Sequence, residues 1–406
     1  MSQKNLTFAQ NLNKTLIQNM AKKKVAINGF GRIGRLTFRN LLKKRNIEVV
    51  AINDLTDNGT LAHLLKYDSV QGAFDGKVAY DENSITVNRR KIHAYSQRDP
   101  QKLPWKKLKV DLVLECTGHF RTKDGASKHL KAGAKDVVIS APGKGDGIQT
   151  IVLGVNDDEL DRRANVFSNA SCTTNCLAPV VKIIDDNWGI QVGSMTTTHA
   201  YTSDQRIQDA PHRDLRRARA AAMNIVPTST GAASAVGKVI PSVEGKLDAI
   251  AVRVPVVTGS MIELNILLNK ETTAQAVNNK FRRAAKGAMK GILEYQEDPI
   301  VSSDIIRNPH SSIFDSMMTS VNGPMLKVVS WYDNEAGYSA RLADLCSLIA
   351  SSKKTKRRKT AKRKTSTRKT TARKTTAKRA ANKKAAPRKA SSRKSTTVRK
   401  KRTAKK

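Results

Sequence analysis

The feature that most restricts the fold is a glycine-rich turn between two short apolar segments. Residues 22–28 read KKKVAIN and residues 47–53 read IEVVAIN, short runs rich in β-branched residues that are typical of buried strands. Between them, RIGRLTFRNLLKK (32–44) carries apolar residues at helical spacing. The sequence therefore predicts a strand, a helix and a second strand, with NGFGRIG as the first connection.

This connection has the G-x-G-x-x-G spacing, formed by Gly29, Gly31 and Gly34, and Asp54 follows Gly34 by 20 residues at the end of the next strand. Glycines let the backbone approach a pyrophosphate, and the helix N-terminus offers it unpaired N–H groups. An Asp54 carboxylate would accept a hydrogen bond from a ribose 2′-hydroxyl and repel a 2′-phosphate. The pattern favours NAD over NADP; the alternative is a glycine turn in an α/β domain that binds no nucleotide.

More strands and a helix follow in alternation. DLVLECTG (111–118), DVVISA (136–141) and TIVLGV (150–155) read as strands, and DGASKHLKAG (124–133) as a helix. Such alternation is typical of a parallel sheet with helices on both faces. The first half of the chain is therefore predicted to be a Rossmann-type, doubly wound α/β domain.

The pattern changes after residue 169. Strands are predicted over 193–202, 249–257 and 261–268, with long connections and one clear helix over 274–293. This arrangement favours a second domain of the α+β class.

The segment NASCTTNC (169–176) contains two of the four cysteines, Cys172 and Cys176. The seven histidines are dispersed and there is no C-x-x-C, so a metal site is not expected. A disulfide between the two sulfurs over one helical turn would be strained. The remaining interpretation is a thiolate at a helix start, activated by a distant histidine.

Longer motifs between residues 22 and 350 resemble those of phosphorylating glyceraldehyde-3-phosphate dehydrogenases. They are NGFGRIGR, NDLTD, LLKYDSVQG, SNASCTTNCLAP, TTTHAYTSDQR, DLRRARAAA, STGAA, RVP and SWYDNEAGYS. The resemblance implies NAD as cofactor, glyceraldehyde 3-phosphate and inorganic phosphate as substrates, a thioester intermediate and a homotetramer. Erythrose-4-phosphate dehydrogenase, a sibling with the same cysteine chemistry, is the alternative. Ala210 stands where NAD-preferring members of the family usually carry a bulkier apolar residue, and Pro211 follows it where dual-cofactor members carry Ser. NAD stays the expected cofactor, and weak use of NADP is left open.

By this resemblance Cys172 is the nucleophile and His199 its base. A free thiol is only a few per cent ionised at neutral pH, and an imidazolium and a helix N-terminus would lower its pKa. The resemblance implies that the cofactor is bound by Gly29, Gly31, Arg32, Ile33, Gly34, Asp54, Arg98, Ser140 and Asn334. It implies that substrate and phosphate are bound by Ser171, Thr173, Thr202, Arg217, Thr230, Gly231 and Arg253, and it implies no metal.

The predicted organisation is a two-domain body with an extension at each end. Its parts are an N-terminal extension (1–21), an NAD-binding Rossmann domain (22–171) completed by a C-terminal helix (333–351), a catalytic domain (172–332) and a Lys/Arg-rich tail (352–406). Met20 would itself make a credible start, so residues 1–19 are either an appended arm or an artefact of start-codon choice. No apolar run approaches the ~18 residues of a membrane span, and the free thiols suit a reducing compartment, which favours the cytoplasm.

The tail carries most of the net charge of +40. Residues 353–406 contain 27 of the 74 lysines and arginines and none of the 34 acidic residues. Basic pairs recur every five residues from Arg358-Lys359 to Arg393-Lys394, a period that leaves no core face on a helix, so disorder is expected. In composition the tail resembles histone H1-like chromatin proteins, which implies binding to nucleic acid and a nucleoid association. Another polyanion, a solubility appendage, and a nucleic-acid-associated protein with an incidental enzyme body are the alternatives.

Overall fold

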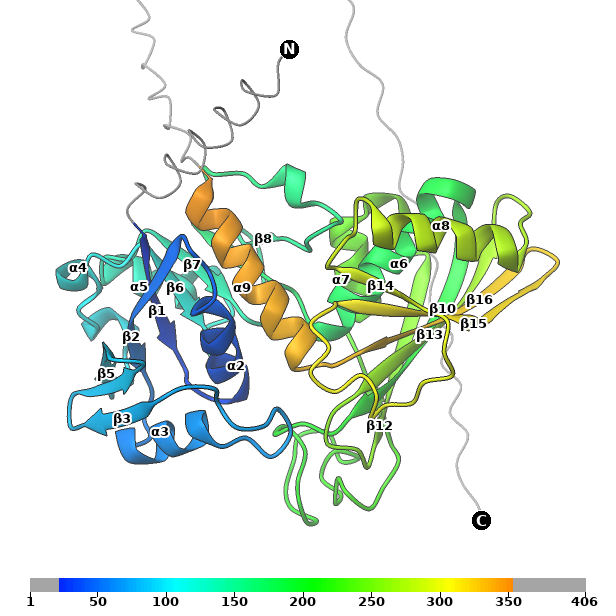
Figure 1. The fold of residues 1–406 in the computed structure, drawn as a ribbon. Helices are drawn as coiled ribbons and strands as arrows, with labels where there is room; N and C mark the ends of the chain where they lie inside the picture. The colour runs from blue at the N-terminus through cyan, green and yellow to red at the C-terminus, as the bar shows by residue number, and fades with distance from the viewer. Residues whose placement is uncertain (1–21, 353–406) are drawn as a thin grey trace, which may run out of the picture. The chain divides into compact units, whose positions relative to one another are not determined.

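The computed structural model describes residues 22–352, and the predictions made for residues 1–21 and 353–406 lie outside the described residues. The described part forms two sheets, each with its own hydrophobic core (Figure 1). None of its helices is long and apolar enough to cross a membrane. The predicted fold class, a Rossmann-like α/β domain followed by a mixed α/β domain, is confirmed.

The first domain contains a nine-stranded sheet in the order β3-β4-β5-β2-β1-β6-β7-β9-β8. Neighbouring strands are parallel except in the pairs β3–β4 and β4–β5, so β4 runs opposite to the others. The bounds are β1 Lys23–Asn28, β2 Ile47–Asn53, β3 Val78–Asp81, β4 Ser84–Val87, β5 Arg90–Tyr95, β6 Leu112–Glu115, β7 Asp136–Ile139, β8 Gln149–Thr150 and β9 Val166–Ser168.

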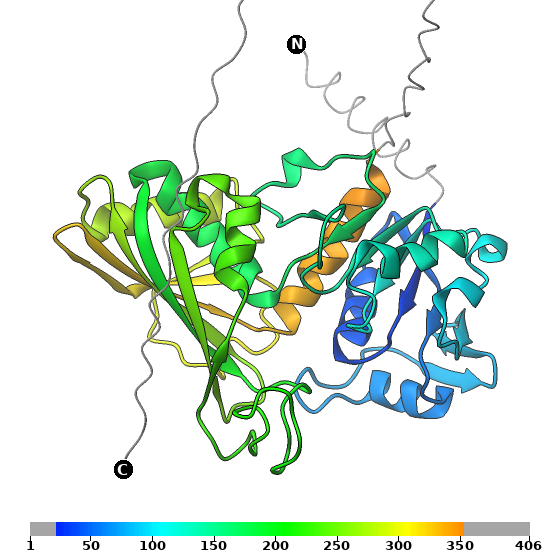
Figure 2. The same ribbon diagram turned by 180° about the vertical axis from the view of Figure 1, so that it is seen from behind.

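Helices cover both faces of this sheet. One face packs against α2 (Arg32–Leu41), α3 (Asn58–Lys66) and α9 (Ala336–Ser351). The other packs against α4 (Trp105–Leu108) and α5 (Lys123–Lys131), which Figure 2 shows from behind. The helix α9 comes from the end of the described chain and lies beside α2, so the first domain is built from both ends of that part of the chain.

The predicted strand, glycine turn, helix and strand are present as β1, α2 and β2. Gly29 has a φ of +92°, and a Cβ there would lie 2.8 Å from the carbonyl carbon of Cys116. A Cβ on Gly34 would lie 2.2 Å from the carbonyl oxygen of Gly29. Both positions therefore need glycine, the first for its backbone conformation and both for the close approach of α2 to the strand ends.

One predicted strand is largely wrong. Of TIVLGV, only Thr150 belongs to a strand, the short β8, while residues 151–155 are buried without being strand. The amide of Val152 donates to Oδ1 of Asn156 (2.9 Å), and Gly154 has a φ of +80°. Backbone polar groups of this apolar run are thus hydrogen-bonded within a turn. Hydrophobic periodicity does not distinguish such a buried turn from a buried strand.

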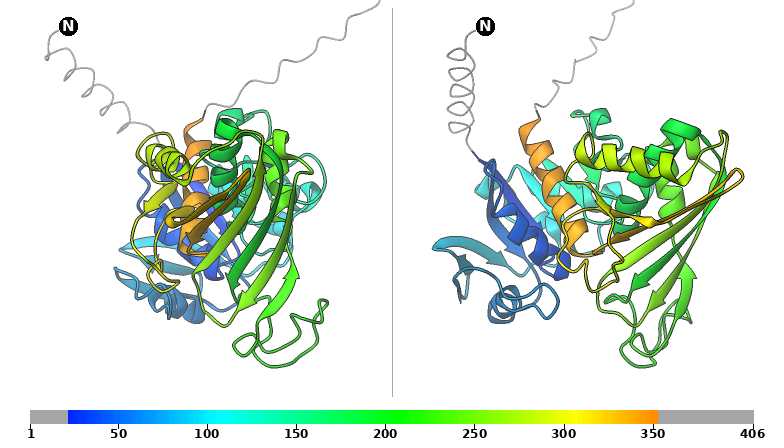
Figure 3. Two further views of the ribbon diagram at one scale, coloured as in Figure 1. Left: turned by 90° about the vertical axis from the view of Figure 1, so that its right-hand side faces the viewer. Right: turned by 45° about the vertical axis from the view of Figure 1, so that its right-hand side comes forward.

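The second domain contains a seven-stranded mixed sheet in the order β11-β12-β10-β13-β16-β15-β14. Its strands are β10 Ile190–Ala200, β11 Val226–Ser229, β12 Leu247–Val254, β13 Ser260–Leu268, β14 Leu293–Gln296, β15 Ser312–Asn322 and β16 Met325–Tyr332. Helices α6 (Cys172–Trp188), α7 (Ala232–Val239) and α8 (Ala274–Lys286) pack on one face (Figure 3). The sequence identified only α8 as a clear helix and placed its end too late; α6 carries Pro179 in its interior, which obscures its length.

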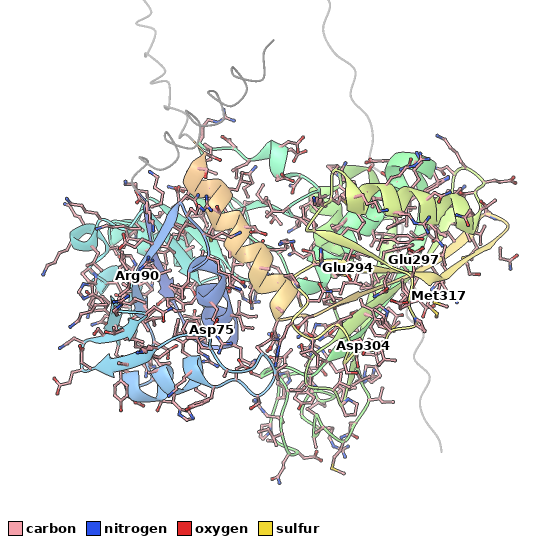
Figure 4. All side chains as sticks on the ribbon, viewed as in Figure 1. Asp75, Arg90, Glu294, Glu297, Asp304 and Met317 are labelled. Atoms are coloured by element: carbon pink, nitrogen blue, oxygen red, sulfur yellow. The ribbon has the colours of Figure 1, made fainter. Side chains whose placement is uncertain are left out.

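Charged side chains are exposed on both domains (Figure 4). Asp75 and Arg90 are exposed on the first domain and Glu297 on the second. The side chains that concern function lie instead between the strand ends of the two domains.

Candidate active site

The candidate nucleophile Cys172 is the first residue of α6. The preceding turn places Ala170 in the left-handed region (φ 55°), and the Ser171 hydroxyl caps the helix by accepting from the amide of Thr174 (3.0 Å). Tyr338 of α9 donates its hydroxyl proton to the carbonyl oxygen of Ala170 (3.0 Å). The sulfur is therefore held at a helix N-terminus by contacts from both domains.

The candidate base His199 lies near the end of β10. Its Nε2 is 3.5 Å from Sγ of Cys172, and the imidazole is almost fully buried. The hydroxyl of Tyr332 lies 2.9 Å from the hydroxyls of both Thr173 and Thr197, and its ring packs edge-on against the imidazole. The structure thus brings together a thiol and an imidazole that are 27 residues apart in the sequence.

The guanidinium of Arg253 contacts the other nitrogen of this imidazole. Arg253 is the partner of His199 on the parallel strand β12, and its Nη1 lies 2.8 Å from Nδ1 of His199 and 2.9 Å from the carbonyl oxygen of Ala200. A guanidinium only donates, so the contact with Arg253 requires Nδ1 to accept and places the imidazole proton on Nε2. Nδ1 also lies 2.6 Å from that carbonyl oxygen, a contact that requires Nδ1 to donate, so the two contacts call for opposite proton positions on the imidazole.

Burial determines the resting charges of the pair. It lowers the pKa of His199 to about 3, with a further contribution from the charge of Arg253. Burial also raises the pKa of the Cys172 thiol, against the guanidinium of Arg253 and the amide of Thr173, which both lower it. The sequence led us to expect an imidazolium beside the sulfur; in this structure the neighbouring cation is Arg253, because a buried imidazole next to a guanidinium stays neutral.

The other sulfur of the motif is in a different setting. Cys176 is fully buried, its Sγ lies 3.6 Å from the hydroxyl of Ser312, and burial raises its pKa to about 12. Cys176 is therefore a packing residue.

Two neighbouring cavities contain most of the predicted site residues. One, of about 520 Å³, holds the thiol and imidazole, and its lining includes Arg32, Ile33, Ser140, Ser171, Cys172, His199, Thr202 and Asn334. The other, of about 490 Å³, lies at the carboxyl ends of the first sheet, and its lining includes Gly29, Gly31, Asp54 and Arg98. Gly34 lines neither, because it packs against Gly29.

The residues of these cavities fit a dinucleotide. Helix α2 begins at Gly31 without a side-chain cap or an acidic residue in its first turn, so its first N–H groups remain for an anion. A Cβ on Gly31 would meet nothing within 4 Å, which leaves open space above these groups. The Asp54 carboxylate is fixed by the amides of Phe30 (2.7 Å) and Thr56 (3.0 Å), and the remaining lone pairs suit ribose hydroxyls.

The side chain of Arg32 is engaged within the protein. Its guanidinium pairs with Glu335 and lies 3.1 Å from Asp68, and the bond to Glu335 raises the pKa of Arg32. A contact of this residue with the cofactor would therefore come from its backbone. At the other end of the cavity, the Oδ1 of Asn334 accepts from the hydroxyl of Ser260 (2.9 Å), which leaves its amide as a donor.

The remaining predicted phosphate residues do not line the thiol cavity. Arg217 reaches its edge through a bond to Asp204 (2.5 Å), which does line it, and also bonds to the hydroxyl of Thr228 (2.9 Å). Gly231 is the N-cap of α7 and gives it no side-chain cap, and the hydroxyl of the preceding Thr230 accepts from the amide of Ala232 (3.3 Å).

Three residues that contact this site were missed as candidates by sequence reasoning. Tyr332, Glu335 and Tyr338 all belong to the motif SWYDNEAGYS, from which only Asn334 was taken. Their contacts join residues more than 150 positions apart, so no local pattern indicates them. Only the resemblance of the whole motif to that of the family could have pointed to these residues.

An uncapped glycine turn at the carboxyl end of a parallel sheet, next to a buried thiol and imidazole, defines an α/β dehydrogenase of the nicotinamide-dinucleotide class. Residues 23–123 match the family model for the NAD binding domain of glyceraldehyde 3-phosphate dehydrogenase, and residues 171–334 match the model for its C-terminal domain. The chain belongs to the glyceraldehyde-3-phosphate dehydrogenase family and is an NAD-dependent oxidoreductase.

Curated relatives are similar in sequence to this chain over nearly their whole length. The glyceraldehyde-3-phosphate dehydrogenase of Thermotoga maritima is 57% identical over 329 residues, which cover 80% of this chain and 98% of the relative. That of Geobacillus stearothermophilus is 55% identical over 330 residues, 81% of this chain and 98% of the relative. That of Mycobacterium tuberculosis is 56% identical over 336 residues, 81% of this chain and 99% of the relative.

We expect substitution of Arg253 by Gln to slow alkylation of Cys172 at neutral pH. The thiolate forms only as pH rises through the thiol pKa, and loss of a cation that lowers this pKa moves the midpoint of the pH–rate profile upward, by about one pH unit. The measurement is iodoacetamide modification of the Cys172 peptide followed by mass spectrometry. Arg253→Lys keeps the charge and should shift less; an unchanged midpoint in Arg253→Gln would show that the guanidinium charge does not act on the sulfur.

Proposed function

We propose that the chain catalyses the NAD-dependent oxidative phosphorylation of glyceraldehyde 3-phosphate to 1,3-bisphosphoglycerate, through a thioester on Cys172. The observation that carries the proposal is the 3.5 Å approach of the sulfur to Nε2 of His199 in a cavity that Asn334 also lines. A nucleophile, a proton acceptor and a donor for a nicotinamide amide are thus close together.

In the proposed reaction, Sγ of Cys172 bonds to the aldehyde carbon and its proton passes through His199 to the new hydroxyl, which gives a thiohemiacetal. His199 Nε2 then removes this hydroxyl proton while the hydrogen on the same carbon leaves with its bonding electron pair, as a hydride. NAD supplies the two-electron acceptor for this step, and a thioester remains on the sulfur. Inorganic phosphate attacks the thioester carbon, the C–S bond breaks, and the product leaves as an acyl phosphate with Cys172 restored.

The contacts of Arg253 affect which nitrogen of His199 carries the proton during these reaction steps. A hydrogen bond from its Nη1 to Nδ1 of His199 requires the imidazole proton on Nε2, toward the sulfur. Base catalysis at Nε2 requires the proton on Nδ1, where the carbonyl oxygen of Ala200 is 2.6 Å away as an acceptor. A substrate phosphate that draws Arg253 away would therefore prepare His199 as a base.

We assign the binding of the two phosphate groups to the residues around the thiol. Thr202 and Arg253 suit the substrate phosphate, since one lines the cavity and the other lies against its imidazole. The cradle for attacking phosphate would be formed by Ser171, Thr173, Arg217, Thr230 and Gly231. Arg217 would have to exchange its bond to Asp204 for one to phosphate, at modest cost because both are charge-assisted.

We expect NADH formation from glyceraldehyde 3-phosphate to require inorganic phosphate, because the thioester must be released for turnover. The measurement compares glyceraldehyde 3-phosphate and erythrose 4-phosphate, each with and without phosphate. Higher kcat/KM with erythrose 4-phosphate would favour the alternative dehydrogenase, and turnover independent of phosphate would contradict the acyl-phosphate product.

Cys172→Ser should lose several orders of magnitude in rate, because a serine hydroxyl stays protonated where a thiol ionises. Cys176→Ser, at the buried cysteine, is the control and should stay active if it folds.

We propose that the enzyme is a homotetramer, as the family resemblance implies. Ile207, Leu215, Met223 and Ile225 are between 69% and 90% exposed and all lie between β10 and β11. Four large apolar side chains in one connection are more than an isolated subunit usually leaves in water, so a second copy of the chain is a suitable cover. The same connection also supplies Thr202 and Asp204 to the lining of the thiol cavity.

We expect a sedimentation mass close to that of four chains, and dissociation when Ile207 is replaced by Glu, since a buried charge would oppose association. Tyr80→Glu is the matched control, because Tyr80 is 61% exposed on β3 of the first domain. Equal masses for both variants would contradict the assignment of this connection to the interface.

We propose further that the basic tail binds nucleic acid and associates the cytoplasmic enzyme with the nucleoid. The support is its sequence alone: 27 cationic residues in 353–406 with no acidic residue to offset them. Each phosphate neutralised contributes to an affinity that falls steeply with salt. No aromatic residue lies in this segment, so base stacking and sequence readout are not expected.

We expect the full chain to retard duplex DNA in a gel at low salt and a chain ending at Ala350 not to do so. Raising salt from about 50 mM to about 200 mM should weaken binding by several orders of magnitude. Unchanged dehydrogenase activity of the shortened chain would show that the body is intact. Equal retardation by both chains would show that the tail does not cause DNA binding. Stronger binding to RNA or to anionic vesicles would identify another polyanion as the ligand of the tail.

A further inference from the structure

A chain of hydrogen bonds between buried side chains begins behind the first sheet. The indole Nε1 of Trp105 in α4 donates to Nδ1 of His129 in α5 (3.0 Å), and Nε2 of His129 lies 3.0 Å from Oε2 of Glu115, the last residue of β6. Each of the three side chains is at most 1% exposed. A carboxylate at this depth is costly unless donors surround it, so the arrangement requires a reason beyond packing.

The series of hydrogen bonds continues toward the cofactor cavity. Nδ2 of Asn28 donates to Oε2 of Glu115 (2.6 Å), and Oδ1 of Asn28 accepts from Nδ2 of Asn53 (2.7 Å). Asn53 then bonds to both backbone groups of Gln97: its Nδ2 donates to the carbonyl oxygen (2.9 Å) and its Oδ1 accepts from the amide (2.8 Å). The bonds thus run from α4 to the loop that follows β5.

The direction of every bond in this chain is fixed. An indole only donates and an ionised carboxylate only accepts, so His129 must accept at Nδ1 and donate from Nε2. The amide and hydroxyl of Thr117 also donate to Glu115, which completes its set of donors. Asn28 must then turn Nδ2 toward the carboxylate and Oδ1 toward Asn53, which sets the orientation of both amides.

The last residues in this series of hydrogen bonds line the cavity of about 490 Å³. Asn28, Asn53 and Gln97 end or follow three neighbouring strands, β1, β2 and β5. Asp54, whose carboxylate suits a ribose of the cofactor, follows Asn53 directly, and Arg98 follows Gln97. In dinucleotide-binding folds an acidic residue at this place binds the adenosine ribose, so we assign this cavity to the adenosine half of NAD. Its two cofactor side chains are then held through their neighbours. The loop of Gln97 has no regular secondary structure, and Asn53 supplies the hydrogen bonds that a strand partner would provide.

We propose that Trp105, His129 and Glu115 are positioning residues for NAD. They touch no ligand; they orient Asn28 and Asn53 and thereby fix the distance between Asp54 and Arg98 across the cavity. This inference rests on the proposed assignment of that cavity to the adenosine half of the cofactor.

The test is Trp105→Phe, which removes the first donor and keeps an aromatic ring in the core. The expected result is a rise of about three- to five-fold in the Kd of both NAD and ADP-ribose, measured by calorimetric titration, as expected for the loss of one hydrogen bond. At saturating NAD, kcat and the alkylation rate of Cys172 should stay unchanged. If Trp105→Phe does not fold, His129→Gln gives the same comparison, because it keeps an amide donor toward Glu115 and loses the bond to the indole.

Trp331→Phe is the matched control, because Trp331 donates its indole N–H to Asp315 (3.1 Å) in the second domain. Its Kd for NAD should equal that of the unaltered protein. Equal Kd values in Trp105→Phe and the unaltered protein, or a change in kcat in place of Kd, would overturn the inference. Asp54→Ala separates the two levels: if it leaves ADP-ribose binding unchanged, the cavity assignment fails; if it weakens binding while Trp105→Phe does not, only the positioning role fails.

Discussion

The hydrogen bond from Tyr338 to the carbonyl oxygen of Ala170 is the contact on which the rest of the site depends (3.0 Å). Tyr338 lies on α9, which packs with α2 on the nucleotide-binding sheet, and Ala170 precedes the thiol at the start of α6. The bond therefore fixes the sulfur of one domain relative to the cofactor pocket of the other. Reaction at a bound cofactor needs positions accurate to a fraction of an ångström, and contacts of this kind between the two domains provide them.

Burial sets the chemistry of the site as strongly as charge does. It stabilises a neutral imidazole at His199 and disfavours an isolated thiolate at Cys172, while the guanidinium of Arg253 and the start of α6 favour the thiolate. Both pKa shifts favour a neutral thiol beside a neutral imidazole, so transfer of the proton from sulfur to nitrogen requires a change in their surroundings. A permanently ionised pair would not need a substrate to activate it, so this neutral resting pair suits a nucleophile that reacts only with its proper partner.

The parts of the molecule that could be predicted from sequence are local or repeated in known families. The strand, turn and helix around Gly29 follow from short-range rules, and His199 was found through a motif that recurs in the family. The strand predicted over residues 151–155 failed because a buried turn and a buried strand have the same apolar pattern. The Trp105–His129–Glu115 chain was not predicted, because it joins three elements through side-chain geometry that leaves no periodic signal.

In the proposed mechanism, Arg253 would connect recognition of the substrate with its chemistry. One nitrogen of the guanidinium contacts both Nδ1 of His199 and the carbonyl oxygen of Ala200, while the buried Nε has no partner among the described residues. An incoming phosphate would offer this group the oxygen acceptors that its surroundings lack, so exchange of the neutral nitrogen for an anion would be favourable. With the guanidinium turned to the phosphate, Nδ1 would donate to Ala200 alone and Nε2 would accept a proton. The group proposed to recognise the phosphate would thus also determine when the imidazole is a base, which would link correct binding to reaction.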